Sequence, residues 1–516
     1  MNFTSRLRLT IHRVAVAAIA LVAGAAGGRA DVRLPAIFSD HMVLQQGIPL
    51  TVWGWADEGE VVTVNVAGQE AKGTTRNGKF AVQLRPLAAS ATPCVVTVTG
   101  RTRVDLQDVL VGEVWICSGQ SNMEWPLRAS FQPEEDIAGA TNASIRLFTV
   151  ARAKADAPQA DTKGNWAVCN PGSAGSFSAV GYYFGRDLAK ALKVPVGLIH
   201  TSWGGSPAEV WMSHEALVGN PDHRRDIVDA YARAVERAQE AKAKYDADAA
   251  QLAAQGKKPT GRPPVGPGWK PSELYNAMIA PIIPFGIRGA IWYQGESNAG
   301  RAHEYRTLYP DLIRNWRRDW GLGDFTFLGV QLAPFTKILP EPAESNWAEL
   351  REAQWLATQK LPQVGMAVIT DVGDETDIHP RKKGPVGARL ALAARAIAYR
   401  EPIVASGPVY KSLKVEGARA MVSFNHVGRG LEARGGELTG FAVCGEDRKF
   451  VWARAEILPD NTVAVTSPAV ARPVAVRFGW ANYPVVNLWN RDGLPASPFR
   501  TDDFPMITAP KTPVVK

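Results

Sequence analysis

The sequence predicts an α/β protein in which a three-layer α/β/α domain with a parallel sheet is flanked by two β-sandwich-like modules. Apolar runs typical of buried strands alternate with helical stretches over residues 106–400. Short segments rich in β-branched and aromatic residues precede this region over residues 31–105 and return over residues 401–516. A chain of 516 residues is also too long for one compact core.

The first 30 residues are predicted to be a cleaved export signal. A basic segment with Arg6, Arg8 and Arg13 precedes an apolar run over residues 14–26, and small residues lead to Ala30. The run is too short to cross a bilayer comfortably, and the alternative is an uncleaved anchor. We therefore expect a periplasmic or secreted mature chain with no stable membrane span.

The two terminal modules are predicted from strand composition. The first has β-branched and aromatic segments separated by turn signals such as the Asn-Gly pair at residues 77–78, which is typical of a small antiparallel sandwich. Its predicted strands are residues 50–56, 61–66 and 94–99. The last module has predicted strands at residues 420–425, 441–443, 462–466 and 474–478.

The central region alternates mostly apolar strands with helices, the pattern of a parallel sheet covered on both faces. The predicted strands are residues 109–118, 194–201, 289–293, 325–331 and 364–370. The predicted helices are residues 180–192, 305–316, 347–359 and 386–399. A further helical segment, rich in Ala, Lys, Glu and Asp, covers residues 224–254 and precedes a Pro/Gly-rich link. We interpret residues 215–270 as a surface insertion, with a lid as the alternative.

Composition excludes several function classes. The net charge of +8 falls to +4 without residues 1–30, which carry four Arg and no acid, and no long basic block argues for nucleic acid. The four Cys form no CxxC pair and are predicted to be buried free thiols, although one disulfide is the alternative. No HxxxH spacing, calcium loop or phosphate loop occurs, so we expect no metal.

Polar residues that follow the predicted strands are the candidate site, because ligands bind beyond the carboxyl ends of an open α/β sheet. Ser121 lies at a strand-to-helix turn, where it is either a nucleophile or a helix N-cap. Trp203 follows the second strand, and the amides of Gly204 and Gly205 suit an oxyanion hole or a plain turn.

The third and last strands supply the remaining candidates. Gln294 is a candidate oxyanion donor, and Glu296 is a candidate to orient a base or bind substrate hydroxyls. Asp377 lies two residues before His379, and a carboxylate beside an imidazole can fix its tautomer when His takes a serine proton.

These blocks in this order resemble the sialate O-acetylesterase family of SGNH hydrolases. The resemblance spans nearly the whole mature chain. Its motifs are Gly-Gln-Ser-Asn-Met at 119–123, Ser-Trp-Gly-Gly-Ser-Pro at 202–207, Trp-Tyr-Gln-Gly-Glu-Ser-Asn at 292–298 and Asp-Ile-His-Pro at 377–380, with two further hallmarks at 38–45 and 350–354. It implies an SGNH-hydrolase α/β/α fold and a serine esterase that removes O-acetyl groups from sugars and needs no cofactor.

The resemblance also implies roles. Ser121 would attack the acetyl carbonyl with His379 as general base and then acid, while the Ser121 N–H, a Gly204 or Gly205 amide and the Gln294 side chain hold the oxyanion. The third member of the triad stays open. Many SGNH enzymes place Asp three residues before the His, where this chain has Thr376, so both Asp377 and Glu296 are candidates.

The substrate class is likewise left open between O-acetylated sialic acid, with a 9-O-acetyl group or a related ester, and acetylated xylan or xyloglucan. Trp203 is a candidate substrate-binding residue. Arg351 is a candidate to pair with a sialic acid carboxylate, or else forms a helix-surface salt bridge with Glu349 or Glu352. The alternative of another class is a catalytically inactive carbohydrate-binding protein. The sequence leaves the oligomeric state undecided.

Overall fold

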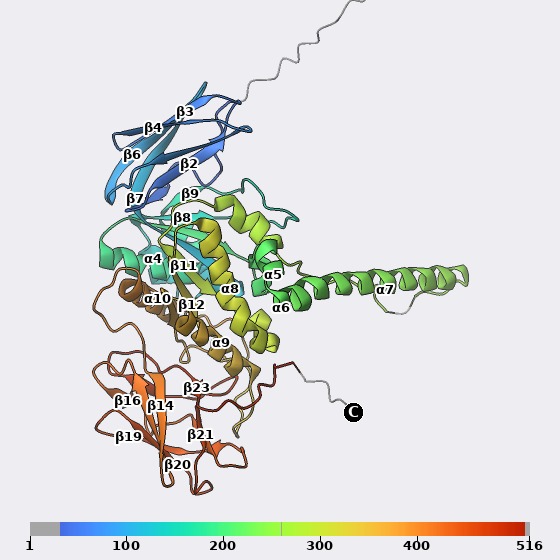
Figure 1. Ribbon diagram of the computed structural model, residues 1–516, viewed down its shortest axis with the longest axis vertical. Helices are drawn as coiled ribbons and strands as arrows, with labels where there is room; N and C mark the ends of the chain where they lie inside the picture. The colour runs from blue at the N-terminus through green and yellow to red at the C-terminus, as the bar shows by residue number, and fades with distance from the viewer. Residues whose placement is uncertain (1–30, 260, 511–516) are drawn as a thin grey trace, which may run out of the picture.

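The computed structural model describes residues 31–259 and 261–510, so the predicted signal at residues 1–30 lies outside the described residues. Three β-containing regions follow one another along the long axis of the molecule (Figure 1). The N-terminal strands lie at one end, the α/β region lies in the middle, and the C-terminal strands lie at the other end.

A seven-stranded path forms the central sheet, in the order β13-β12-β11-β7-β10-β8-β9. All neighbours on this path are parallel except β8 and β9. The chain fills one side of β7 with β8–β10 and then the other side with β11–β13, so the carboxyl end of β7 is the topological switch point. These strands are β7 (Arg103–Gly119), β8 (Asn142–Thr149), β9 (Trp166–Cys169), β10 (Val196–Ser202), β11 (Gly289–Tyr293), β12 (Thr326–Val330) and β13 (Val364–Ala367).

Helices cover both faces of this sheet. Successive residues of a strand point to opposite faces, and the buried strands are apolar on both, so each face needs a covering layer. Val114 and Ile116 of β7 pack in one core cluster with residues of α8 and α9, whereas Trp115 and Cys117 pack in a second cluster with residues of α4 and α10. The covering helices are α4 (Ala179–Leu192), α8 (Ala302–Trp320), α9 (Asn346–Lys360) and α10 (Gly384–Ile397). The molecule is therefore a mixed α/β protein with a mostly parallel central sheet.

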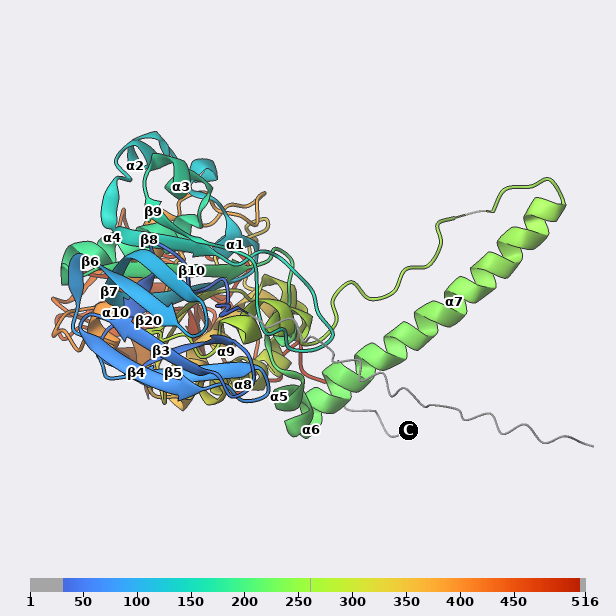
Figure 2. The same cartoon turned by 90° about the horizontal axis from the view of Figure 1, so that it is seen from above.

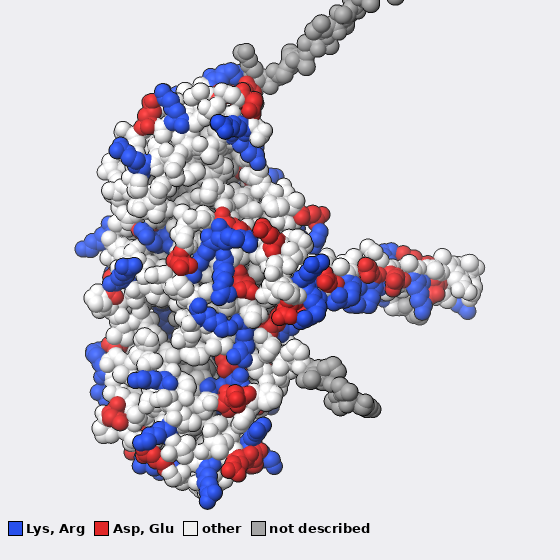
Figure 3. Space-filling model, viewed as in Figure 1, with Lys and Arg blue, Asp and Glu red and all other residues white. Residues whose placement is uncertain are grey.

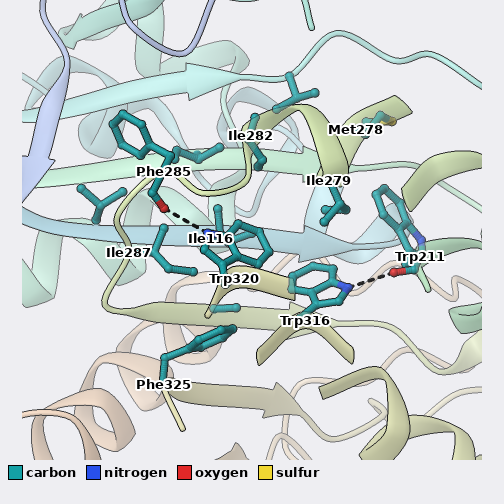
Figure 4. Packing of buried hydrophobic residues seen from close by; sticks show 14 of the residues in the cluster. Ile116, Trp211, Met278, Ile279, Ile282, Phe285, Ile287, Trp316, Trp320 and Phe325 are labelled. Atoms are coloured by element: carbon teal, nitrogen blue, oxygen red, sulfur yellow. Dashed lines mark hydrogen bonds between the residues drawn. The ribbon is translucent and has the colours of Figure 1, made fainter. Parts of the chain in front are cut away.

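Tryptophan fills much of the core on the α8 face (Figure 4). The buried indole N–H groups find backbone acceptors: Trp316 donates to the Trp211 carbonyl at 2.9 Å, and Trp320 donates to the Phe285 carbonyl at 3.0 Å. These bonds remove the cost of burying an unpaired donor inside an apolar cluster.

The N-terminal strands are continuous with the central sheet. The predicted strand at 109–118 begins already at Arg103, and the first half of β7 pairs with β6 and β1 before its second half enters the central sheet. β6 pairs with β3, β3 pairs with β4, and β2 and β5 form a separate antiparallel pair. The bounds are β1 (Val43–Gln45), β2 (Leu50–Trp55), β3 (Val61–Val66), β4 (Gln69–Thr74), β5 (Lys79–Leu84) and β6 (Ser90–Thr99).

The C-terminal strands form two four-stranded antiparallel sheets, β14-β15-β20-β19 and β18-β17-β21-β23, and the pair β16-β22. Their apolar residues make a third core cluster. The strands are β14 (Val409–Glu416), β15 (Arg419–Asn425), β16 (Leu431–Ala433), β17 (Phe441–Cys444), β18 (Val451–Trp452), β19 (Arg454–Ile457), β20 (Val463–Thr466), β21 (Ala475–Phe478), β22 (Leu488–Asn490) and β23 (Phe499–Arg500).

One helix leaves the body altogether. α7 (Asp229–Ala254) has 26 residues and projects as an arm, with the chain returning beside it (Figure 2). None of its residues is buried, and acidic and basic side chains both lie along it (Figure 3). The remaining turns and short helices are α1 (Ser121–Glu124), η1 (Leu127–Ala129), α2 (Glu134–Ala138), α3 (Pro171–Ser176), η2 (Ala208–Trp211), α5 (His214–Gly219), α6 (Pro221–His223), η3 (Arg224–Val228), η4 (Tyr275–Ile279), η5 (Ala280–Ile282) and η6 (Glu296–Arg301).

Two further findings concern the described residues alone. All four Cys lie within them as free thiols, of which three are buried and Cys94 is partly buried. Within residues 31–259 and 261–510, no helix has the length and apolar character needed to cross a membrane.

Candidate active site

Ser121 lies at the carboxyl end of β7, where the sheet order reverses. β7 ends at Gly119, whose φ of 137° and whose approach to Tyr293 leave no space for a side chain: a Cβ there would lie 2.1 Å from the Tyr293 carbonyl oxygen. Ser121 is the first residue of α1, and Gln120 holds the N-cap position, so the N-cap interpretation of Ser121 is wrong. The first N–H groups of a helix have no partner within it, which makes this end suited to a negative charge.

His379 reaches Ser121 from the loop after β13. Its Nε2 lies 2.9 Å from Ser121 Oγ, and its Nδ1 lies 3.2 Å from Asp377 Oδ1. The same Asp377 oxygen accepts the His379 backbone N–H at 2.8 Å, so one carboxylate holds both the backbone and the ring. The Trp125 ring stacks on the imidazole with centroids 5.2 Å apart. The sequence predicted Ser121, His379 and Asp377, and the structure brings them together in a chain of contacts.

Glu296 lies beneath this chain and contacts it through Asn122. Asn122 donates from Nδ2 to Glu296 Oε1 at 2.6 Å and to the Ile378 carbonyl at 3.0 Å, next to His379. The buried Lys383 donates to Asn122 Oδ1 at 2.5 Å. Burial raises the pKa of Glu296 and lowers the pKa of Lys383 to about 7, and each charge opposes the shift of the other. Glu296 therefore supports the loop of His379, whereas the imidazole itself contacts Asp377.

Gly204 packs directly against Ser121. A Cβ on Gly204 would meet Ser121 Cβ at 3.2 Å, whereas a Cβ on Gly205 would meet nothing within 4 Å. The Gly204 N–H donates to Glu124 Oε2 at 2.6 Å, and the other oxygen of Glu124 pairs with Arg152. A carboxylate oxygen thus already occupies the acceptor position of the Gly204 amide, close to Ser121.

An aromatic pair borders this side of the site. Trp203 and Trp269 contact edge to face at 5.7 Å between ring centroids, and Lys154 Nζ lies 4.2 Å from the Trp269 ring centroid. Lys154 is paired with Glu273 at 2.8 Å, and the Arg152 guanidinium lies 5.6 Å from the Trp203 ring centroid. Trp203 is therefore partly buried beside the Gly204 turn and is available as a wall for a bound group.

Gln294 does not fit its predicted role as an oxyanion donor. Its side chain is fully buried, and its Nε2 donates to Asn298 Oδ1 at 2.6 Å and to the Ser206 carbonyl at 3.3 Å. Its Oε1 accepts from the Tyr305 hydroxyl at 2.8 Å. Both amide hydrogens are thus used inside the protein, and the side chain braces the turn that carries Gly204.

Arg351 does not fit its predicted role in substrate binding either. It is completely buried, and its guanidinium donates to four backbone carbonyls, those of Leu332, Ala333, Ala481 and Asn482, at 2.6–3.1 Å. The alternative surface salt bridge is also absent. Arg351 instead joins the end of β12 to the C-terminal strands, and burial lowers its pKa to about 9.

Comparison with known proteins shows the family to which this chain belongs. The family model described as carbohydrate esterase, sialic acid-specific acetylesterase, matches residues 111–265 and 265–396. The sialate O-acetylesterase of Rattus norvegicus is 30% identical over 88% of this chain and 90% of its own length. This chain belongs to the sialate O-acetylesterase family. It is a carboxylic ester hydrolase of that family.

A second relative and a solved structure have similar coverage. The human sialate O-acetylesterase is 27% identical over 88% of both chains. The crystal structure of a carbohydrate acetylesterase from Xanthomonas citri has a TM-score of 0.79 and 38% identity, and covers 92% of this chain and 100% of its own. The likeness to this carbohydrate acetylesterase structure therefore covers the strands on either side of the α/β region as well as that region itself.

A second Ser–His pair lies near the first and has a different environment. Ser202 Oγ and His200 Nε2 are 2.6 Å apart, but both residues are buried, with exposed fractions of 4% and 7%. Burial lowers the pKa of His200 to about 4, so its imidazole is neutral at pH 7. Ser121 is partly buried, so it is the more exposed of the two serines. Within residues 31–259 and 261–510, no group of three or more His, Cys, Asp or Glu is arranged to hold a metal ion.

Sequence reasoning did not identify Asn122 and Lys383 as site residues of this sialate O-acetylesterase family member. Asn122 follows Ser121 directly, and its position inside the Ser121 motif is the signal that could have identified it. Lys383 carried no signal, because a lone lysine after the His379 loop is usually a solvated residue, and only the fold places it beneath Asn122.

Proposed function

We propose that the protein is a serine carbohydrate O-acetylesterase with Ser121 as nucleophile, His379 as general base and acid, and Asp377 as the acid that orients His379. The observation that supports this most strongly is the 2.9 Å contact from His379 Nε2 to Ser121 Oγ at the start of α1. A serine hydroxyl becomes a nucleophile when a neighbouring imidazole takes its proton, and a third group usually orients that imidazole.

In the proposed first step, Ser121 Oγ forms a bond to the acetyl carbon while His379 Nε2 takes the hydroxyl proton. The C–O bond to the sugar then breaks, and His379 returns the proton to the departing sugar oxygen, which leaves an acetyl group on Ser121. Water then attacks the acetyl carbon while His379 takes its proton, and the bond to Ser121 Oγ breaks, which releases acetate and restores the serine hydroxyl. The N–H groups of Ser121 and Gly204 would stabilise the oxyanion, once the ester oxygen displaces the Glu124 carboxylate from the Gly204 amide.

The proposed substrates are O-acetylated sugars. Acetylated sialic acid is favoured by the names of the mammalian relatives. Acetylated xylan or xyloglucan is favoured by the state of the cations near Ser121. Arg351 is buried, Arg152 is paired with Glu124, and Lys154 is paired with Glu273. These cations are therefore not free to bind a sialic acid carboxylate.

The test is acetate release by the purified protein from O-acetylated sialic acid, acetylated xylan and acetylated xyloglucan. Ser121→Ala serves as the matched variant. We expect release that depends on Ser121 and the preferred sugar to identify the substrate class. No release from any of these, with the fold intact, would favour the alternative of an inactive carbohydrate-binding protein.

We also propose that the chain is exported, to the periplasm or beyond, since its first 30 residues have the pattern of a cleaved signal. N-terminal sequencing of the mature protein from fractionated cells tests this. Cleavage after Ala30 is the expected result, and an intact N-terminus in the cytosolic fraction would overturn it.

A further inference from the structure

A large hollow lies outside the Ser121 site, at the C-terminal strands. Its volume is about 720 Å³, which is within the range of sites that hold small molecules or short oligosaccharides. Its lining comes from the loop between β12 and α9 and from three segments of the C-terminal region, and includes none of Ser121, Asp377 or His379. The lining segments are residues 338–345, 437–441, 452–456 and 479–486.

Exposed apolar side chains gather around this hollow. Trp452 has 44% of its surface exposed, and Ile338, Leu339 and Val485 are also exposed and line the same space. Scattered single apolar residues are ordinary on a surface, whereas several of them around one concave site indicate a binding surface. Trp452 is held in place because its indole N–H donates to the Pro340 carbonyl at 2.7 Å. A fixed, half-exposed indole offers a flat face to the C–H face of a sugar ring.

The charge of the lining favours a neutral ligand. Carboxylates from Glu341, Glu344, Glu437 and Glu456 line the hollow, against one guanidinium from Arg454. Glu344 is paired with Arg477 at 2.8 Å, which still leaves acidic groups in excess. A wall of this sign repels a sialic acid carboxylate, whereas carboxylate oxygens accept hydrogen bonds from neutral hydroxyls.

The hollow is physically connected to the loop of the catalytic histidine. The Ile338 N–H donates to Glu375 Oε2 at 3.0 Å, and Phe335 pairs with Asp374 in a short parallel bridge. Asp374 in turn accepts the backbone N–H of Asp377 at 3.1 Å. The wall of the hollow therefore contacts the loop that ends in the Asp377–His379 pair.

We propose that this hollow binds the neutral backbone of an acetylated polysaccharide while Ser121 acts on an acetyl group of the same chain. This inference deepens the proposed function, and the action of Ser121 on an acetyl group of the bound chain rests on that function. Binding in the hollow itself requires no chemistry, so it can be measured apart from catalysis.

The test uses the full chain with Ser121→Ala and calorimetric titration with deacetylated xyloglucan and xylan oligosaccharides, beside a sialylated oligosaccharide. We expect a neutral oligosaccharide to bind, and Trp452→Ala or Leu339→Asp to weaken it about tenfold or more. Trp452 is 44% exposed and Leu339 is 50% exposed, so neither change should unfold the protein. Trp55→Ala, in the N-terminal strands, is the matched control and should leave affinity unchanged.

In the active protein, the same two variants should raise KM for the acetylated polymer and leave turnover of an aryl acetate unchanged. Failure of every neutral oligosaccharide to bind, tighter binding of the sialylated one, or binding insensitive to both variants would overturn the proposal. Oligosaccharide binding without any acetate release would instead refute the proposed function and leave the binding site standing.

Discussion

The acid that supports His379 is tested by replacing each candidate carboxylate with its amide. Asp377→Asn keeps the oxygen that accepts the His379 backbone N–H and removes the charge beside the imidazole. Two opposite charges about 4 Å apart attract by about 1 kcal/mol in water and about 4 kcal/mol near a protein surface. The Asp377 side chain is 49% exposed, which places the loss between these limits. A loss of about 2–3 kcal/mol of transition-state stabilisation should lower kcat/KM roughly 30- to 150-fold.

Glu296→Gln should have a much smaller effect, because Glu296 contacts Asn122 and leaves the imidazole to Asp377. Glutamine keeps an oxygen that accepts from Asn122, so Asn122 still donates to the Ile378 carbonyl and kcat/KM should stay within about threefold. Glu296→Ala leaves one N–H of the Asn122 amide without its acceptor and should cost about 1–3 kcal/mol of stability.

The assay is aryl acetate hydrolysis as kcat and KM for each variant, with thermal unfolding recorded alongside. A positioning role for Glu296 predicts that Glu296→Gln rescues what Glu296→Ala loses. A loss of two orders of magnitude in Glu296→Gln, with Asp377→Asn close to the unmodified protein, would refute the assignment of Asp377.

Three further predictions concern the Gly204 turn, the buried histidine and the arm. Gly204→Ala should lower kcat by at least about tenfold with little change in thermal stability, because its Cβ would crowd Ser121 at 3.2 Å. Gly205→Ala should instead leave kcat nearly unchanged and lower thermal stability. A Cβ there would meet open space, but the φ of 75° costs Ala about 1 kcal/mol. Burial lowers the pKa of His200 to about 4, below its unfolded value of 6.5, so the unfolded chain takes up a proton first and the free energy of unfolding falls as pH drops from 6.5 to 4. Urea unfolding at stepped pH should show this fall in the unmodified protein and in the exposed-site control His214→Gln, and a flatter profile in His200→Asn; equal slopes in all three would contradict it. Ala243→Pro, in the exposed middle of α7, should lower helical circular dichroism and leave aryl acetate turnover and the main unfolding transition unchanged, and a large loss of turnover would instead indicate a lid.

The strands and helices that surround the site could be predicted because each carries an uninterrupted periodic signal. The strand at 289–293 has the predicted bounds. The helix expected at 180–192 differs from α4 by one residue at its start, and the helix expected at 347–359 differs from α9 by one residue at each end. The strand β8 was missed because Arg146 interrupts its apolar run. That arginine is buried only because Asp108, far from it in sequence, pairs with it at 2.7 Å.

Some site residues could be predicted from the sequence in the same way, and others could not. Ser121, Gly204 and His379 follow strands of one parallel sheet, so their common edge brings them together whatever the details of the loops. The internal partners of Gln294 and Arg351 could not be predicted, because residue type does not show which distant backbone atoms will satisfy a polar group. Arg351 bonds the carbonyl of Ala481, 130 residues away, and no local pattern encodes that contact.

The most direct test of the account measures acetate release from an aryl acetate by the unmodified protein, Ser121→Ala and Ser202→Ala. Two serines contact a histidine, and we assign catalysis to Ser121 alone. This assignment predicts that Ser121→Ala loses at least about 10⁴-fold in kcat while Ser202→Ala keeps most of it. Retained turnover in Ser121→Ala, with activity lost in Ser202→Ala, would contradict it.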